Sequence, residues 1–224
     1  MTAPPLVFED VLLEGTRTTA VSLTVPPCRA IAVVGEVATG LDRLGPIALG
    51  LDLPEGGRAL LFGEQVTTMA RQAALAFRRQ AGYVPEGDGL LQNLSLADNV
   101  ALPLQFGSPL SSREVWGRVR VILGAFRLAD VGGLRPSEAD DEQRRRAALA
   151  RALVFDPRLV ILGQPFDGIG LGAAAELLDL ARGGETADGP RRSVLVTSQV
   201  LPDRLRSRFE ERYRVTGGKL RPEP

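Results

Sequence analysis

Short apolar runs alternate with stretches of helical periodicity along most of this chain. Runs such as 30–34 and 159–162 are apolar at every position, which is typical of strands buried on both faces of a sheet. Strands that alternate with helices predict an α/β fold with a mainly parallel sheet. The predicted strands are residues 6–13, 20–25, 30–34, 59–62, 81–84, 159–162 and 193–197, with a hairpin at 213–220. The predicted helices are residues 41–51, 68–80, 138–154, 171–181 and 201–209.

Residues 86–135 have a different pattern from the rest of the chain. Residues 90–104 mix apolar and polar positions, and residues 111–126 have helical periodicity. This segment therefore predicts a helical lobe, and the strong helix expected at 138–154 follows it directly.

The whole chain is expected to form a single domain built around one core. Residues 1–85 and 155–224 are predicted to form that core, and residues 86–154 the helical lobe. The two N-terminal strands flank a short turn at 14–16 and are expected to be antiparallel. The polar, glycine-containing stretch at 182–192 predicts a surface loop.

The composition is that of a globular protein and removes several kinds of chemistry. Of the 224 residues, 44% are hydrophobic and 24% are charged, which is enough to bury a substantial core. The absence of histidine excludes a histidine base, metal ligand or pH switch. Cys28 is the only cysteine, so neither an intrachain disulfide nor a cysteine metal cluster is expected. The only lysine is Lys219, so no lysine is available for a phosphate-binding loop.

The charge balance and the apolar runs also limit the partners and the location. Lys and Arg total 27, as do Asp and Glu, so the net charge gives no support for a nucleic-acid partner. The first residues contain neither a basic segment nor an apolar one, so no signal peptide is expected. No apolar run approaches the ~20 residues that span a bilayer. A cytoplasmic protein is therefore expected, with any membrane role supplied by a partner.

A glycine-rich turn between a buried strand and a predicted helix is the first sign of a particular family. Gly35 and Gly40 have P-loop spacing after the strand at 30–34. Further segments resemble, in order and spacing, the Q-loop, signature helix, Walker B strand and switch strand of ABC-transporter ATP-binding subunits. These segments are residues 82–104, 145–153, 156–166 and 194–198, followed by a similar ending at 217–220.

The resemblance covers almost the whole chain and implies a P-loop NTPase-like ABC ATPase fold. It also implies ATP and Mg²⁺ as the family's cofactors. Residues 99–104 and 145–149 look most like the ATPases of Mla/MCE-type phospholipid transporters, with the cell-division and lipoprotein-release ATPases as close rivals.

Nearly every position to which the family assigns phosphate binding is altered in this chain. The P-loop Lys position is Leu41, and the Ser/Thr position that reaches Mg²⁺ is Asp42. Glu36 adds a second carboxylate, and both carboxylates would repel a triphosphate. Asp42 or Glu36 is expected either to fill part of the anion site formed by the loop amides or to remain solvated. The degenerate P-loop comprises Gly35, Glu36, Val37, Ala38, Thr39, Gly40, Leu41 and Asp42.

The other catalytic positions implied by the resemblance are altered as well. The Q-loop Gln position is Glu86, and the switch His position is Ser198. The Walker B Asp-Glu pair is Gly163-Gln164, which offers neither a metal ligand of that kind nor a base. The degenerate signature motif comprises Ala139, Asp140, Asp141, Glu142 and Gln143, where the acids would oppose phosphate or simply cap a helix. No catalytic residue is intact, no metal site is expected, and tight binding of ATP or Mg²⁺ is not expected.

The resemblance implies a membrane permease subunit as partner and a dimer with an identical or different ATPase subunit. We expect a catalytically degenerate cassette subunit, peripheral on the inner face of the cytoplasmic membrane, that docks on a permease in a structural or regulatory role. Two alternatives remain open: a weak or altered ATPase that uses Glu86, Asp167 or Gln164, and a soluble regulatory module without a membrane partner.

Overall fold

The computed structural model describes residues 3–14, 18–184 and 192–223, and within them nine strands form one mixed sheet in the order β4-β1-β2-β9-β8-β3-β7-β6-β5. The strands are β1 (Leu6–Leu13), β2 (Thr19–Val25), β3 (Ala30–Val34), β4 (Gly56–Leu61), β5 (Ala81–Val84), β6 (Leu159–Gly163), β7 (Ser193–Ser198), β8 (Glu211–Thr216) and β9 (Lys219–Pro222). The predicted α/β class is confirmed.

The sheet has a parallel centre and antiparallel pairs toward one edge. β3, β5, β6, β7 and β8 form parallel pairs, whereas β1 is antiparallel to both β2 and β4. The expectation of antiparallel N-terminal strands is therefore confirmed. The predicted C-terminal hairpin is also present, because β8 and β9 pair antiparallel.

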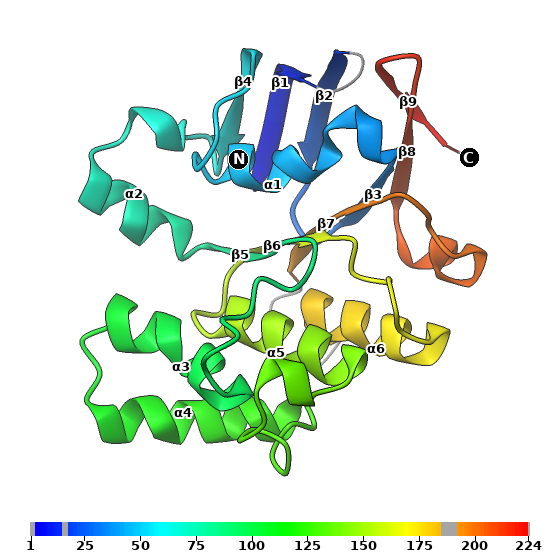
Figure 1. Ribbon diagram of the computed structural model, residues 1–224. Coiled ribbons are helices and arrows are strands. Elements are labelled where there is room, and N and C mark those ends of the chain that lie inside the picture. The colour runs from blue at the N-terminus through cyan, green and yellow to red at the C-terminus, as the bar shows by residue number, and fades with distance from the viewer. Residues whose placement is uncertain (1–2, 15–17, 185–191, 224) are drawn as a thin grey trace.

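The helices lie on both sides of the sheet. They are α1 (Leu44–Ala48), α2 (Arg71–Arg78), α3 (Leu96–Gly107), α4 (Ser112–Ala125), α5 (Asp141–Leu153) and α6 (Leu171–Arg182). Figure 1 shows α3, α4, α5 and α6 below the parallel strands, and α1 above them beside β1 and β2. None of the described helices is long and apolar enough to cross a membrane.

Two apolar clusters hold these layers together, one on each face of the sheet. Ala30, Ala32 and Val34 of β3 point into the cluster that contains α5 and α6. Ile31 and Val33 of the same strand point into the cluster that contains β1, β2 and α1. Strand side chains alternate between faces, so a run of five buried apolar residues contributes to both cores.

Two predicted helices differ from the structure. The helix expected at 41–51 is a 3₁₀ turn, Leu41–Arg43, followed by the single short helix α1. The helix expected at 201–209 is a 3₁₀ helix, Asp203–Arg208. Pro202 is its N-cap, where a missing N–H costs nothing in any helix, so the proline marks the start of the helix but does not explain its 3₁₀ form.

Two predicted surface segments lie partly outside the described residues. The turn at 14–16 includes residues 15–16, and the loop at 182–192 includes residues 185–191.

Candidate functional site

The loops that follow four parallel strands meet at one edge of the sheet and enclose a cavity of about 210 Å³. Ligand sites of open α/β sheets lie at these carboxyl ends of strands. The described residues that line the cavity are Gly35, Glu36, Leu41, Asp42, Gly45, Tyr83, Glu86, Gly163, Gln164, Thr197, Ser198 and Gln199. The structure thus brings together the P-loop, Q-loop, Walker B and switch positions of the sequence analysis, as expected.

The remaining predicted positions lie elsewhere. Ala38 and Thr39 line a neighbouring cavity of about 450 Å³ between the loop and the β8–β9 hairpin. Val37 belongs to a 3₁₀ turn, Val37–Thr39, and its side chain lies outside the described part of the structure. The signature positions are not among the described residues that line the first cavity.

The loop after β3 is compact. Its two 3₁₀ turns, Val37–Thr39 and Leu41–Arg43, are separated by Gly40 at φ 72°. A Cβ at Gly40 would lie 2.8 Å from the backbone oxygen of Glu14, so the close approach of the neighbouring chain requires glycine here.

Leu41, at the lysine position, packs back onto the loop. Its side chain is buried and belongs to the apolar cluster around β1, β2 and α1. A Cβ at Gly35 would lie only 2.8 Å from Leu41 Cδ1, so the leucine covers the start of the loop. An apolar group therefore occupies the place where the family has a cation for phosphate.

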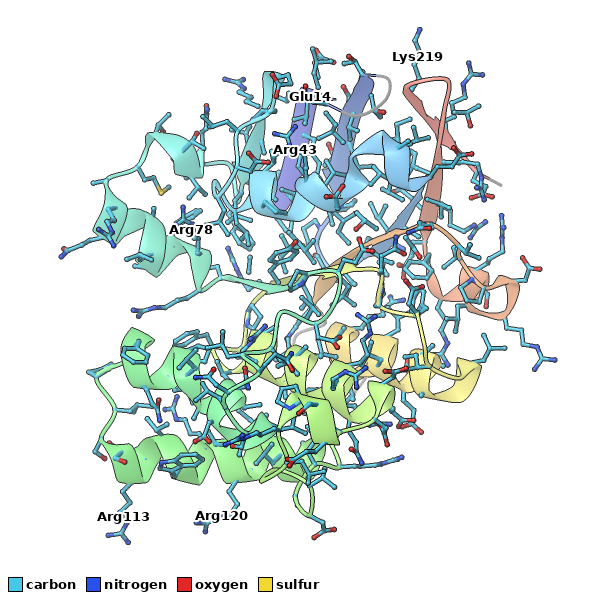
Figure 2. All side chains as sticks on the ribbon, viewed as in Figure 1. Glu14, Arg43, Arg78, Arg113, Arg120 and Lys219 are labelled. Atoms are coloured by element: carbon cyan, nitrogen blue, oxygen red, sulfur yellow. The ribbon has the colours of Figure 1, made fainter. Side chains whose placement is uncertain are left out.

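The cations of the described chain do not supply the missing charge. Arg43, next to Asp42, donates from Nε to Asp52 Oδ2 at 2.8 Å and from Nη2 to the Leu53 oxygen at 2.9 Å. Its hydrogen bond to Asp52 raises the pKa of Arg43, although burial opposes the shift. Figure 2 shows Lys219 at the tip of the β8–β9 hairpin, pointing away from the body of the protein.

Three carboxylates line the cavity without compensation. Glu36, Asp42 and Glu86 are exposed, and within the described residues none of their carboxylates forms a hydrogen bond or ion pair. None of these carboxylates accepts a hydrogen bond from a described amide of the loop, which favours the solvated alternative for Glu36 and Asp42. The Thr39 hydroxyl and amide bond the Glu36 backbone oxygen instead, at 2.5 and 3.0 Å.

Tyr83, which the sequence analysis did not single out, forms one wall of the cavity. A Cβ at Gly45 would lie 2.3 Å from Tyr83 Cε2, so the ring packs directly on the backbone of α1. Burial raises the pKa of Tyr83, and the negative charges of Asp42 and Glu86 add to the shift. The Gly45-Pro46 step, noticeable in the sequence as a break in helical pattern, is the place that accommodates this ring.

The two Walker B positions, Gly163 and Gln164, are in close contact with neighbouring loops. A Cβ at Gly163 would lie 2.9 Å from the Glu86 backbone nitrogen, so this loop occupies the space that a side chain at 163 would need. Gln164 has φ 47°, and its Oε1 accepts hydrogen bonds from Ser198 Oγ at 3.2 Å and Gln199 N at 3.0 Å. The base and switch positions are thus bonded to each other.

The acids at the signature positions serve the start of α5. Asp140 is the N-cap, with Oδ1 accepting from Gln143 N at 2.7 Å in a capping box. Asp141 pairs with Arg144, and Glu142 pairs with Arg146 at 2.8 Å. The helix-capping interpretation is confirmed, and two of these three charges are compensated within the chain.

A mixed sheet with a parallel centre, flanked by helices and with a P-loop-spaced turn after β3, is the arrangement of a P-loop NTPase-like domain. A family model described as ABC transporter matches residues 18–167, which include the P-loop, signature and Walker B positions. The chain belongs to the ABC transporter family.

Relatives of known function and solved structures agree with this assignment. The chain is 33% identical over 165 residues to the lipoprotein-releasing system ATP-binding protein LolD of Chromohalobacter salexigens, covering 73% of this chain and 69% of LolD. It is 31% identical over 161 residues to the intermembrane phospholipid transport system ATP-binding protein MlaF of Escherichia coli K12, covering 70% and 60%. The dimeric bacterial ABC transporter cassette MJ0796 shares the fold with a TM-score of 0.83 at 21% identity, over 97% of each chain.

Proposed function

We propose that this chain is an ABC cassette subunit that docks on a membrane permease as a structural or regulatory component and does not hydrolyse ATP. The observation that carries this proposal is the cavity described above. It is lined by three uncompensated carboxylates, and no Lys or Arg is among the described residues that line it.

Charge alone gives only part of the expected loss of ATP affinity. Two like charges about 4 Å apart cost about 1 kcal/mol in water and about 4 kcal/mol at an effective dielectric constant of about 20. The carboxylates of Glu36, Asp42 and Glu86 are exposed, so the lower value applies. The larger part comes from groups that are missing, since the lysine, metal-ligand and base positions are Leu41, Gly163 and Gln164.

Exposed apolar side chains near the junction of core and lobe support the docking part of the proposal. Phe106 of α3 is 85% exposed, Leu75 of α2 is 51% exposed, and Leu91 is 44% exposed. Figure 1 shows α2 and α3 on the same side of the molecule, above and below this junction. Exposed apolar groups gathered near one junction are typical of a protein–protein contact.

The names of two relatives suggest the kind of transport system in which this chain works. MlaF is named for intermembrane phospholipid transport and LolD for lipoprotein release. We therefore extend the proposal to a lipid-transport assembly of the Mla/MCE type, in which the chain pairs with an identical or different cassette subunit at the cytoplasmic membrane.

Calorimetric titration of the purified chain with ATP and Mg²⁺ tests the loss of nucleotide binding. No saturable heat is expected up to millimolar ATP. Micromolar affinity would refute the proposal and favour the alternative of a weak or altered ATPase. Asp167 is not among the described residues that line the cavity, which favours Glu86 and Gln164 as the groups that this alternative would use.

Co-purification with a co-expressed membrane permease subunit tests docking. The Phe106→Asp variant should lose most of the complex. Val121→Asp is the matched control, because Val121 is 73% exposed on α4, away from the junction, and should retain the complex. Equal retention by the two variants, or no complex with the parent chain, would contradict docking at this junction.

A further inference from the structure

The segment between β5 and the helical lobe has an unusual backbone. Gly87, Asp88 and Gly89 are consecutive residues with φ of 73°, 69° and 62°. Glycine adopts this region freely, but an aspartate there is uncommon and needs support from its surroundings. A Cβ at Gly89 would lie 2.7 Å from Pro85 Cγ, so the segment folds tightly back on itself.

The aspartate is buried against two arginines of α5. The Asp88 side chain is 9% exposed, and its Oδ1 lies 3.0 Å from Nη1 of Arg145, whose side chain is 10% exposed. Its Oδ2 lies 3.5 Å from Arg144 Nε. The closest atoms of the Asp88–Arg145 pair are not aligned as a hydrogen bond, so the contact is held by charge. Removing the Asp88 charge would leave Arg145 buried without the ion pair that the structure gives it.

A third arginine of α5 holds the backbone of the same segment. Arg151 donates from Nη1 to the Gly89 oxygen at 2.7 Å and from Nη2 to the Asp88 oxygen at 3.1 Å. Further along, Asn99 of α3 is fully buried and bonds both the amide and the oxygen of Leu91, at 2.8 and 3.0 Å.

We propose that Asp88 and these three arginines form a clamp that fixes the loop after β5, and with it the start of the helical lobe, to α5. α5 is itself fixed to the sheet, because a Cβ at Gly82 of β5 would lie 2.6 Å from the Ala152 oxygen. The clamp therefore holds the Glu86 backbone against Gly163, where both residues line the cavity. This inference does not depend on whether the cavity binds ATP.

Hydrogen exchange of backbone amides tests the clamp. Asp88→Asn keeps the size of the side chain and tolerates positive φ, but it removes the charge. Amides at 86–91 should exchange about tenfold faster or more, since breaking a buried pair releases the segment it holds. Amides of β3 and β7 should be unchanged. Asp52→Asn is the matched control, because it breaks the Arg43–Asp52 pair at 2.8 Å in the other half of the molecule and should leave 86–91 unaffected.

Three outcomes would overturn the clamp: unchanged exchange at 86–91, an equal increase throughout the molecule, or the same local increase in Asp52→Asn. Asp88→Gly relieves the φ but also loses the ion pair, so slower exchange than in the parent chain would mean that backbone strain, and not the ion pair, governs this segment. Faster exchange is expected in this variant too. Arg151→Lys is a milder variant in case Asp88→Asn does not fold. It keeps the charge but loses the bidentate hydrogen bonding, so exchange at 86–91 should increase by less than in Asp88→Asn.

Discussion

Gly163→Asp restores the carboxylate that the family has at the Walker B position, and we expect it to destabilise this chain. Gly163 is fully enclosed in β6, and its missing Cβ would lie 2.9 Å from the Glu86 nitrogen and 3.4 Å from the Pro85 carbonyl carbon. Overpacking of this kind costs about 1–3 kcal/mol. Burying a carboxylate without a partner adds about 1–3 kcal/mol or more. Unfolding free energy should therefore fall by about 3 kcal/mol or more.

Urea denaturation followed by circular dichroism measures this change. Gly163→Ala isolates the steric part and should cost about 1–3 kcal/mol. Gly172→Ala is the control, because no atom lies within 4 Å of its missing Cβ and the site is exposed at the start of α6. It should be neutral or stabilise the protein by up to about 1 kcal/mol.

Adding Mg²⁺ with ATP tests whether the Asp of the Gly163→Asp variant can bind the metal. A ligand that binds only the folded state raises stability with its concentration. The Gly163→Asp variant should gain no stability in millimolar MgCl₂ with ATP. A variant as stable as the parent chain, or one rescued by Mg²⁺ and ATP, would refute the reasoning that the Glu86 loop has closed over this position.

Three further changes test other parts of the structure. Asp140→Ala removes the N-cap of α5 and should cost about 1 kcal/mol in urea denaturation, whereas Asp140→Ser should restore most of it. Gly45→Ala should destabilise by about 1–3 kcal/mol because of the Tyr83 ring, and the loss should shrink when Tyr83→Ala is combined with it. The hydrogen bond from Tyr213 to Glu211 raises the pKa of Tyr213 to about 12, so its contribution is complete below about pH 10 and is lost as pH rises toward 12. Absorbance titration should show this late ionisation, and Glu211→Gln should shift it toward lower pH.

Much of the fold was predictable because buried strands carry a strong signal. The runs at 30–34 and 159–162 begin β3 and β6 at the predicted residues, since a continuous apolar run of that length fits a strand covered on both faces. The short α1 was not predictable in the same way. The Gly45-Pro46 step marks a break in the helical pattern, but the packing of the distant Tyr83 ring on Gly45 carries no local signal in the sequence.

The sequence predicted which residues belong to the candidate site, but it did not predict how they pack against one another. The order of the motifs assigned Glu86, Gly163 and Gln164 to the Q-loop and Walker B positions, and the structure places all three around one cavity. That the Glu86 backbone fills the space beside Gly163 could not be read from residue types, because it depends on the path of a loop. The pairing of Asp88 with Arg145 was not predicted for the same reason. The two residues are 57 positions apart in the sequence, and the overall charge balance does not show which acid pairs with which arginine.

The acids near the two phosphate-facing regions have different physical consequences, although they look alike in the sequence. Asp140 caps α5, and Asp141 and Glu142 are paired with arginines, so their charge is largely compensated within the chain. Glu36 and Asp42 have no such partner in the described structure, but their exposure limits the repulsion they exert. Under the proposed loss of nucleotide binding, repulsion is therefore the smaller contribution. The missing lysine, metal-ligand and base groups weigh more, and the packing of the Glu86 backbone against Gly163 is a steric obstacle to restoring the metal ligand.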